Sequence, residues 1–218
     1  MNTYLDRYCE RVEPGLWAEP LNVVSNLAFL LAAGMLFRAY RAQPVHAPEL
    51  PWLIGLVAAI GAGSGLWHLL ARRWAEYADA LPILAFIGLY FLFALYRLVT
   101  PVWSRVMTVW VGFHLLNAAV QVTLPAELGN GSGFYLPTWL TLLLLALYLG
   151  GRRHPQAEVF GWAALLFLLA LGLRTVDLTL CPRVAFGTHF LWHLMTAGVL
   201  YLLVSGLIAA ARRDAVSP

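Results

Sequence analysis

The chain has 218 residues, of which 61% are hydrophobic and only 11% are charged. Soluble domains average about a quarter charged residues, so this composition excludes a soluble protein and predicts an all-α protein embedded in a membrane. The net charge of +3 comes from arginines at the ends of apolar runs, which makes it an indicator of topology and not of nucleic-acid binding. No lysine is present, which excludes the retinal Schiff base of a rhodopsin.

Seven apolar runs approach the ~20 residues that a membrane-spanning helix needs. In chain order they cover residues 22–40, 51–70, 77–98, 102–122, 134–149, 157–173 and 187–210. We therefore expect a seven-transmembrane-helix bundle. The predicted parts are an N-terminal extramembrane segment (1–21), one seven-helix transmembrane domain (22–211) and a short C-terminal tail (212–218).

Arginine counts predict the orientation of this bundle. The side that holds the C-terminus carries eight arginines and the side that holds the N-terminus carries six, with Arg174 counted in the loop before the seventh run. Because positively charged loops favour the cytoplasmic side, we expect an integral, multi-pass protein with its N-terminus outside and its C-terminus in the cytoplasm.

The entry to the first run carries a polar stripe. Glu19, Asn22 and Asn26 follow an i, i+3, i+7 spacing and so share one helix face. One interpretation is a helix cap with interhelical hydrogen bonds. The other is a group that supports a site, or binds a cation, inside the bundle.

The second run ends with Ser64 and His68, which lie four residues apart on one helix face, and the third begins near Asp79. The glycines before His68 allow a neighbouring helix to approach closely. Taken alone, Ser64 is a packing residue, and Asp79 is a partner for Arg72 or Arg73.

Two further groups of polar residues have structural explanations. His114, Asn117 and Gln121 form a stripe on the fourth run that suits interhelical hydrogen bonds. The segment 130–132 matches a glycosylation sequon, but its glycine-flanked Asn-Gly pair is more simply a turn.

The seventh run opens with His189 and His193, one helical turn apart. Two imidazoles at the edge of a membrane span are costly unless something pairs with them, and neutral imidazole is a common zinc ligand. The end of the second run and the starts of the third and seventh lie on the same membrane side. His68 can therefore complete a three-histidine zinc site with an open position for water.

At that depth the remaining polar groups acquire chemical roles. Asp79 could orient or deprotonate an attacking water, and Ser64 could donate a hydrogen bond to the oxyanion that forms when a carbonyl is attacked. Cys9 and Cys181 fall on the same side, and Asp177 is placed with Cys181 in the loop before the seventh run. A Cys9–Cys181 bridge is topologically allowed and would tie the N-terminus across the mouth of the bundle.

This pattern resembles the alkaline ceramidase family, part of a wider group of membrane hydrolases that includes adiponectin receptors and haemolysin III-like proteins. The resemblance rests on Ser64-x3-His68, Asp79 before Leu81-Pro82, and His189-x3-His193, with similarity in the N-terminal segment from Cys9-Glu10 to Ser25-Asn26. It implies a zinc-dependent amidohydrolase of sphingolipid metabolism. It further implies His68, His189 and His193 as ligands, Asp79 and Ser64 as catalytic residues, and a Cys9–Cys181 disulfide.

The sequence departs from the family in two places. Ala80 follows the aspartate where the family commonly has an acidic residue. Arg7 and Val12 stand where calcium-binding members carry an aspartate and an asparagine. These two replacements make calcium a doubtful cofactor. Glu10 and Glu19 remain as a candidate second cation site.

The sequence thus predicts an intramembrane enzyme that cleaves the amide bond of a ceramide-like N-acyl lipid, which enters from the bilayer. No nucleic acid or obligate protein partner is implied. Two alternatives stay open: a haem-binding or receptor-like bundle that uses the same histidines, and a rhomboid-like serine protease built on Ser64.

Overall fold

The computed structural model describes residues 3–42, 47–125 and 127–216, and over these ranges the regular structure is helical. The elements are α1 (Pro20–Ser25), α2 (Leu27–Arg41), α3 (Glu49–Leu70), α4 (Arg73–Ala94), η1 (Leu95–Val99), α5 (Trp103–Thr123), η2 (Ser132–Tyr135), α6 (Leu136–Gly151), α7 (Ala157–Leu180) and α8 (His189–Val216). They form seven helices long and apolar enough to cross a membrane, which confirms the predicted fold class and an integral multi-pass protein.

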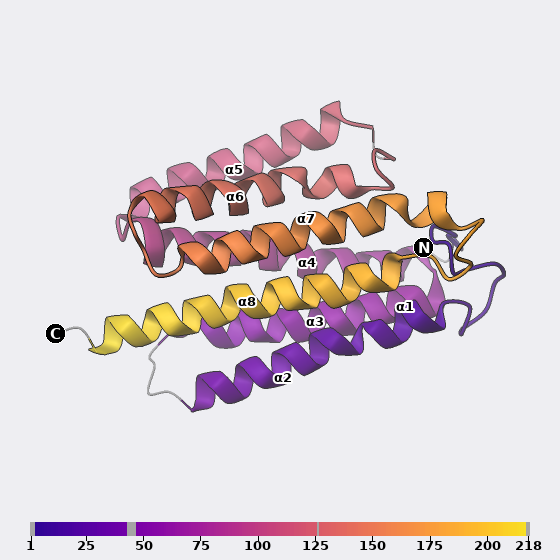
Figure 1. Cartoon of the computed structure of the whole chain (residues 1–218), viewed down its shortest axis with the longest axis horizontal. Coiled ribbons are helices and arrows are strands. Elements are labelled where there is room, and N and C mark those ends of the chain that lie inside the picture. Colours follow the sequence, from indigo (N-terminus) through magenta and orange to yellow (C-terminus); the bar gives the residue numbers. More distant parts are fainter. Residues whose placement is uncertain (1–2, 43–46, 126, 217–218) are drawn as a thin grey trace.

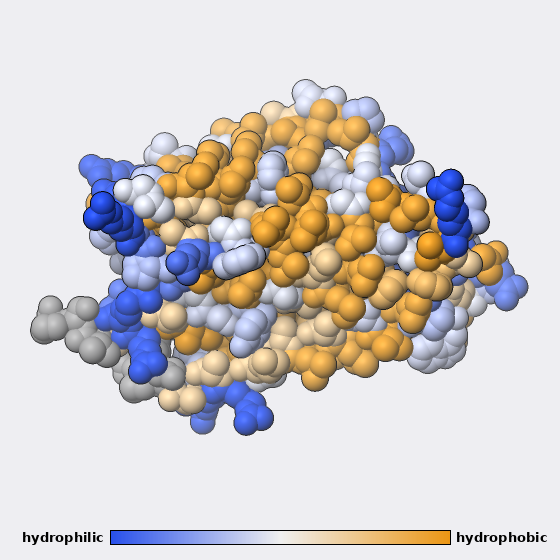
Figure 2. Space-filling view, viewed as in Figure 1, coloured by the Kyte–Doolittle hydropathy of each residue, from blue (hydrophilic) through white to orange (hydrophobic). Residues whose placement is uncertain are grey.

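The helices run side by side along the long axis of the molecule, with the two chain ends at opposite ends of the bundle (Figure 1). The last helix, α8, packs against α2, α3 and α7, while α5 is the outermost helix. Hydrophobic residues cover the middle of the visible face and hydrophilic residues gather at its two ends, as expected for a protein crossing a bilayer (Figure 2).

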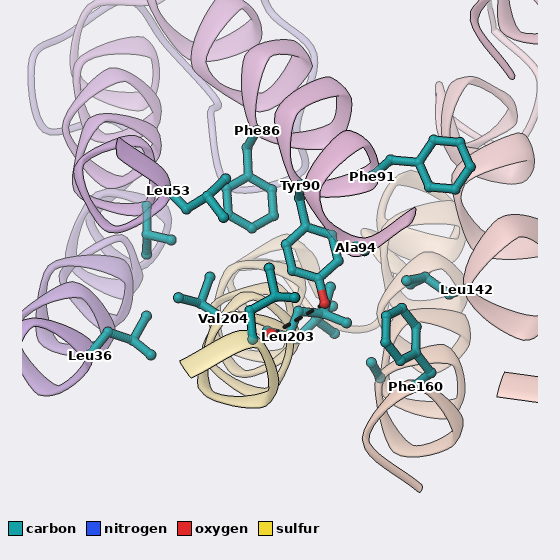
Figure 3. Packing of buried hydrophobic residues seen from close by; sticks show 14 of the residues in the cluster. Leu36, Leu53, Phe86, Tyr90, Phe91, Ala94, Leu142, Phe160, Leu203 and Val204 are labelled. Carbon is teal, nitrogen blue, oxygen red and sulfur yellow. Dashed lines mark hydrogen bonds between the residues drawn. The ribbon is translucent and has the colours of Figure 1, made fainter. Parts of the chain in front are cut away.

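The core lies between α8 and the helices around it (Figure 3). Leu36, Leu53 and Phe160 are almost fully buried, and the Tyr90 hydroxyl donates a hydrogen bond of 3.2 Å to the Leu203 carbonyl. Because lipid tails are as apolar as these side chains, such contacts stabilise the bundle through close packing and buried hydrogen bonds.

Two glycines of α3 bring its neighbours into contact. A Cβ at Gly63 would lie 2.0 Å from the Ala78 carbonyl oxygen of α4, and one at Gly61 would lie 2.8 Å from Phe29 Cβ of α2. Pro82 has no N–H to donate to that carbonyl, which leaves it open to the Gly63 Cα–H. This confirms the predicted close helix approach and fixes Asp79, the residue after Ala78, against α3.

The helix ends differ from the predicted runs at two places that matter for the site. The sixth run was expected to end at 173, but α7 continues to Leu180, so Arg174 and Asp177 are helical and not in a loop as expected. The first span begins at Pro20 and is interrupted at Asn26 between α1 and α2. Both differences arise because these polar side chains face the protein interior. A hydropathy pattern marks the helix residues that contact lipid, so it misses polar helix residues that point inward.

The polar stripe of α5 does not form the expected set of interhelical hydrogen bonds. Gln121 donates to the Phe134 carbonyl before α6, but Asn117 donates within its own helix, to Phe113. The Nε2 atom of His114 is buried without a hydrogen-bond partner. The ring lies against Gly88 of α4 and is held by packing.

Candidate metal centre

Three histidines from two helices converge at one end of the bundle. His68 lies in the last turn of α3, and His189 and His193 occupy the first two turns of α8. Each side chain is at most 2% exposed, and the nitrogens available as ligands lie within 4.8 Å of one another. The structure thus brings together the three predicted ligands, and among the described residues they form the group that could hold a metal ion.

Glu19 holds His68 from behind. Its Oε2 atom lies 2.5 Å from His68 Nδ1 and accepts a second hydrogen bond from Asn22 at 2.9 Å. Burial favours the neutral carboxyl, but the hydrogen bonds with His68 and Arg11 outweigh it and keep the pKa of Glu19 below its usual value. A carboxylate on Nδ1 leaves the Nε2 lone pair of His68 for a metal, the usual arrangement behind a ligating histidine.

His193 is oriented by residues of α1. Its Nδ1 atom lies 2.7 Å from the Ser25 hydroxyl, which in turn donates to the Asn22 carbonyl at 3.0 Å. Because the hydroxyl proton is used in that bond, Ser25 accepts from His193 Nδ1–H, and Nε2 is again the free ligand atom. Glu19 and Asn22, predicted as part of a polar stripe, therefore support the site.

His189 is positioned through its backbone and its ring face. Asp177 accepts hydrogen bonds from the amides of Thr188 (2.6 Å) and His189 (2.9 Å) and so caps the start of α8. Gly187 precedes them with φ of +62°, and a Cβ there would lie 2.2 Å from Asp177 Oδ1. Only glycine fits this turn. Tyr8 stacks on the His189 ring with centroids 4.0 Å apart.

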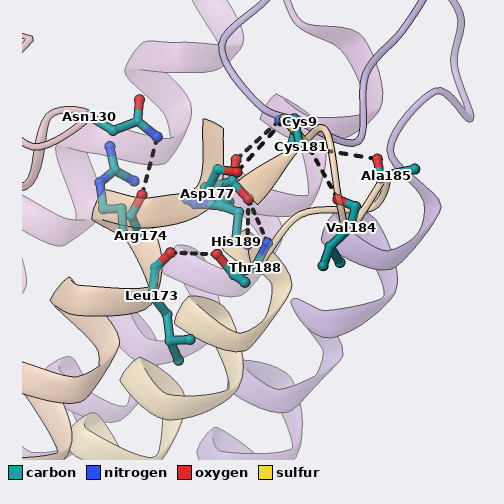
Figure 4. Close-up of a disulfide and its surroundings, with 10 residues drawn as sticks. All are labelled: Cys9, Asn130, Leu173, Arg174, Asp177, Cys181, Val184, Ala185, Thr188 and His189. Atoms are coloured by element: carbon teal, nitrogen blue, oxygen red, sulfur yellow. Dashed lines mark hydrogen bonds between the residues drawn. A yellow bond between two sulfur atoms is a disulfide. The ribbon is translucent and has the colours of Figure 1, made fainter. Parts of the chain in front are cut away.

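A disulfide fastens the N-terminal segment over the centre (Figure 4). Cys9 is bonded to Cys181, with a Cα–Cα distance of 5.5 Å, and the Cys9 amide donates to Asp177 Oδ2 at 3.1 Å. The predicted bridge is therefore present. Asp177 links it to the first turn of α8, where His189 lies.

Arg11 is the residue of this segment that the sequence did not reveal. Its side chain is fully buried, forms an ion pair with Glu19, and donates to the His68 backbone carbonyl at 2.5 Å and to the Gly15 carbonyl at 3.1 Å. One guanidinium thus connects the loop, the carboxylate behind His68 and the end of α3. The fixed fork of an arginine suits such a three-way contact.

We expect Arg11→Met to lower the free energy of unfolding by about 3–5 kcal/mol, because it leaves the buried Glu19 carboxylate without its cationic partner. Thermal unfolding of the purified protein in detergent measures the change. Arg7→Met is the matched control: Arg7 pairs with Glu76 at the surface, and such a pair contributes about 0–1 kcal/mol. Equal unfolding midpoints for the two variants would contradict the assigned role.

The other member of the candidate second cation site, Glu10, has a different environment. Its carboxylate accepts hydrogen bonds from the amides of Leu21 (2.7 Å) and Asn22 (2.9 Å) at the start of α1. Burial raises the pKa of Glu10, while these two hydrogen bonds act in the opposite direction. Both carboxylates are therefore held by protein donors, and Asn22 donates to each of them, to Glu10 through its backbone amide and to Glu19 through its side chain.

A cavity of about 320 Å³ opens beside the histidines and contains the two predicted catalytic residues. Ser64 and Asp79 line it together with His189 and His193, and Ser64 lies within hydrogen-bonding reach of the Asp79 carboxyl. Asp79 Oδ1 is buried without a hydrogen-bond partner. Such an atom, in the same cavity as two of the candidate ligand histidines, is free to bind a water or an N–H group.

The cavity continues from this polar end into the apolar interior. Its deeper walls are formed by side chains of α4, α6 and α8, among them Phe86, Phe91, Leu142, Leu145, Leu200 and Leu203. A volume of this size is typical of small-molecule sites, which combine apolar walls with a few convergent polar groups. The shape therefore suits an amphipathic ligand.

A family model described as Ceramidase matches residues 7–215, nearly the whole chain. A search of curated proteins gave no match for this sequence.

Proposed function

Because the chain belongs to the Ceramidase family, we propose that it hydrolyses the amide bond of a ceramide-like N-acyl lipid, with zinc as its cofactor. The products are a fatty acid and an amine. The cluster of three buried histidines, two of which have a hydrogen-bonded Nδ1 atom, is the observation that carries this proposal.

The donor set supports zinc in particular. Three neutral imidazoles that leave room for a fourth ligand are typical of catalytic zinc, and the supporting carboxylate and hydroxyl behind them are typical of its surroundings. Bound there, zinc supplies Lewis-acid chemistry and makes water a stronger acid at neutral pH.

The chain's own residues then divide the remaining work. Asp79, with its unpartnered Oδ1, accepts a proton from the attacking water and passes it to the leaving amine. Ser64 donates a hydrogen bond to the oxygen on which negative charge develops. The contact between α3 and α4 at Gly63 and Ala78 keeps these two side chains together.

The lipid's acyl chain occupies the apolar part of the cavity in this proposal. Access from the bilayer is supported by α5, which buries only Val106 and Phe113 among its residues and contributes only Phe113 to the cavity wall. A helix with so little packing can move aside at low cost.

We further propose that Arg11 supplies the positive charge that a second cation would bring. Its guanidinium already neutralises Glu19 and contacts two backbone carbonyls, the kinds of oxygen that calcium prefers. Calcium is then not required.

The orientation expected from the sequence is part of the proposal. Arg174 lies in α7 six residues before its end and lines the cavity, so its removal from the loop count leaves five arginines on the N-terminal side against eight on the other. The balance favours a non-cytoplasmic active site and a cytoplasmic C-terminus.

The two alternatives receive less support. The ring centroids of the three histidines lie 4.7 to 5.2 Å from one another. A porphyrin bound between any two of these histidines would therefore displace the third. A serine protease needs a histidine base beside Ser64, but within the described ranges the group in hydrogen-bonding reach of Ser64 is the Asp79 carboxyl.

Metal removal and replacement test the proposed function. We expect the purified protein to contain one zinc per chain and to release fatty acid from ceramide. Treatment with 1,10-phenanthroline should abolish both, and zinc but not calcium should restore them. Elemental analysis and mass spectrometry of fatty acids provide the measurements. A Soret band, or hydrolysis that survives loss of the metal, would overturn the assignment.

A further inference from the structure

Arg174 is a cation in the cavity, where the charge of Asp79 acts on it without forming a salt bridge. It lines the same space as Ser64 and Asp79, and its guanidinium lies 5.7 Å from the Tyr135 ring centroid and 5.4 Å from that of Trp192. Among the described residues, no carboxylate forms a salt bridge with it. Its Nε atom is buried without a hydrogen-bond partner.

The turn before α6 binds the backbone of Arg174 and lies against its guanidinium. The Asn130 side chain donates to the Arg174 carbonyl at 3.2 Å (Figure 4). Gly131 has φ of +78°, and a Cβ there would lie 3.1 Å from Arg174 Nη2. The segment 130–132, expected to be a turn, thus leaves room for the guanidinium against its backbone.

Tyr8 connects Arg174 with the metal centre. The Tyr8 hydroxyl lies within hydrogen-bonding reach of Arg174, while its ring stacks on His189 at 4.0 Å. A group bound to the guanidinium is therefore one tyrosine side chain away from a candidate zinc ligand. That separation suits two parts of one substrate.

A guanidinium in such a place needs an anion. Its charge is costly in low-dielectric surroundings unless it is paired, and the aromatic faces and the Tyr8 hydroxyl leave its Nε–H without an acceptor. The N–H fork of a guanidinium matches the two oxygens of a carboxylate or a phosphate. The other arginine of the cavity, Arg7, already pairs with Glu76 at 2.9 Å.

We propose that Arg174 binds an anionic oxygen group, a carboxylate or phosphate, on the amine part of the N-acyl lipid. This role rests on the proposed amide hydrolysis. The acyl chain then lies in the apolar part of the cavity, the amide at the histidines and the anionic group at Arg174. The enzyme thereby selects acidic N-acyl lipids over neutral ones.

Two matched substrate pairs test this proposal: ceramide 1-phosphate with ceramide, and N-oleoylglycine with N-oleoylethanolamine. We expect the zinc-loaded wild type to prefer the anionic member of at least one pair. In Arg174→Gln the ratio of the two kcat/KM values should fall about 10- to 100-fold, the range for hydrogen bonds to a charged group. Arg7→Gln is the control and should keep the wild-type ratio.

The released fatty acid also carries a carboxylate that Arg174 could bind, so inhibition by oleate is measured in parallel. An oleate inhibition constant that rises in Arg174→Gln while the substrate ratio stays unchanged would assign the residue to product release and overturn the substrate proposal. Zinc content and unfolding temperature check the fold, and Arg174→Lys, which keeps the charge but loses the fork, replaces the glutamine variant if that one does not fold.

The two levels of the proposal fail in different ways. Hydrolysis of neither member of any pair would refute the proposed function. Hydrolysis without preference for an anion, with the ratio unchanged in Arg174→Gln, would refute the role of Arg174 alone.

Discussion

His193→Ala is expected to remove bound zinc and amide hydrolysis together. His193 is 2% exposed, and its Nδ1 atom is fixed by Ser25, which directs Nε2 toward His68 and His189. Two remaining imidazoles cannot complete a structured zinc site, so we expect less than a tenth of the wild-type zinc and no fatty-acid release above background. Elemental analysis and the lipid assay are run on the same preparation.

A histidine far from the centre provides the control. His154 lies in the connection between α6 and α7, at the other end of these helices from His193, and accepts a hydrogen bond from the Gln156 amide. His154→Ala should keep both zinc and activity. Full zinc content in His193→Ala would show that the metal binds elsewhere, and full activity would refute metal-dependent hydrolysis.

The arrangement of the centre explains why an extramembrane segment matters for chemistry inside the bundle. Residues 8–19 contact two of the three histidines, because Tyr8 stacks on His189 and Glu19 is hydrogen-bonded to His68, and the Cys9–Cys181 disulfide fastens this segment to the end of α7. His68 is held by Glu19, and Glu19 by Arg11. The geometry of the ligands therefore depends on a loop and not only on helix packing.

Much of the site could be predicted because the chemistry is concentrated at helix ends. Hydropathy gives the spans, and their order places His68, Asp79 and His189 on one membrane side. The i, i+4 spacing of His189 and His193 then indicates a shared helix face. The spacing of the two histidines is a local property and the order of the spans is a topological one, and both can be predicted from the sequence.

The supporting residues could not be predicted in the same way. Arg11 looks like any loop arginine, and its partners Glu19 and His68 lie 8 and 57 residues away. Asp177 contacts Cys9 across 168 residues. Arg174 ends an apolar run and so resembled a loop charge, whereas in the fold it faces the cavity. Such contacts depend on tertiary packing, for which the sequence offers no periodicity.

Asp79→Asn separates the reaction from metal binding. The variant keeps the size and shape of the side chain, and Asp79 is not one of the three grouped ligands, so zinc content and unfolding temperature should remain at wild-type values. An amide cannot accept the proton from water. We therefore expect kcat to fall by about 10²- to 10⁴-fold, the contribution of a positioned general base.

Glu76→Gln is the matched control for this experiment. Glu76 lies one turn before Asp79 on α4 and also lines the cavity, but its side chain is partly exposed and already pairs with Arg7 and Arg73. Its replacement removes the same charge from the same helix without changing the unpartnered Asp79 oxygen. Equal activity of the two variants would make Asp79 a structural residue. Loss of zinc in Asp79→Asn would instead make it part of the metal site. A slow variant that keeps its zinc, beside a fully active Glu76→Gln, is the result that a general base requires.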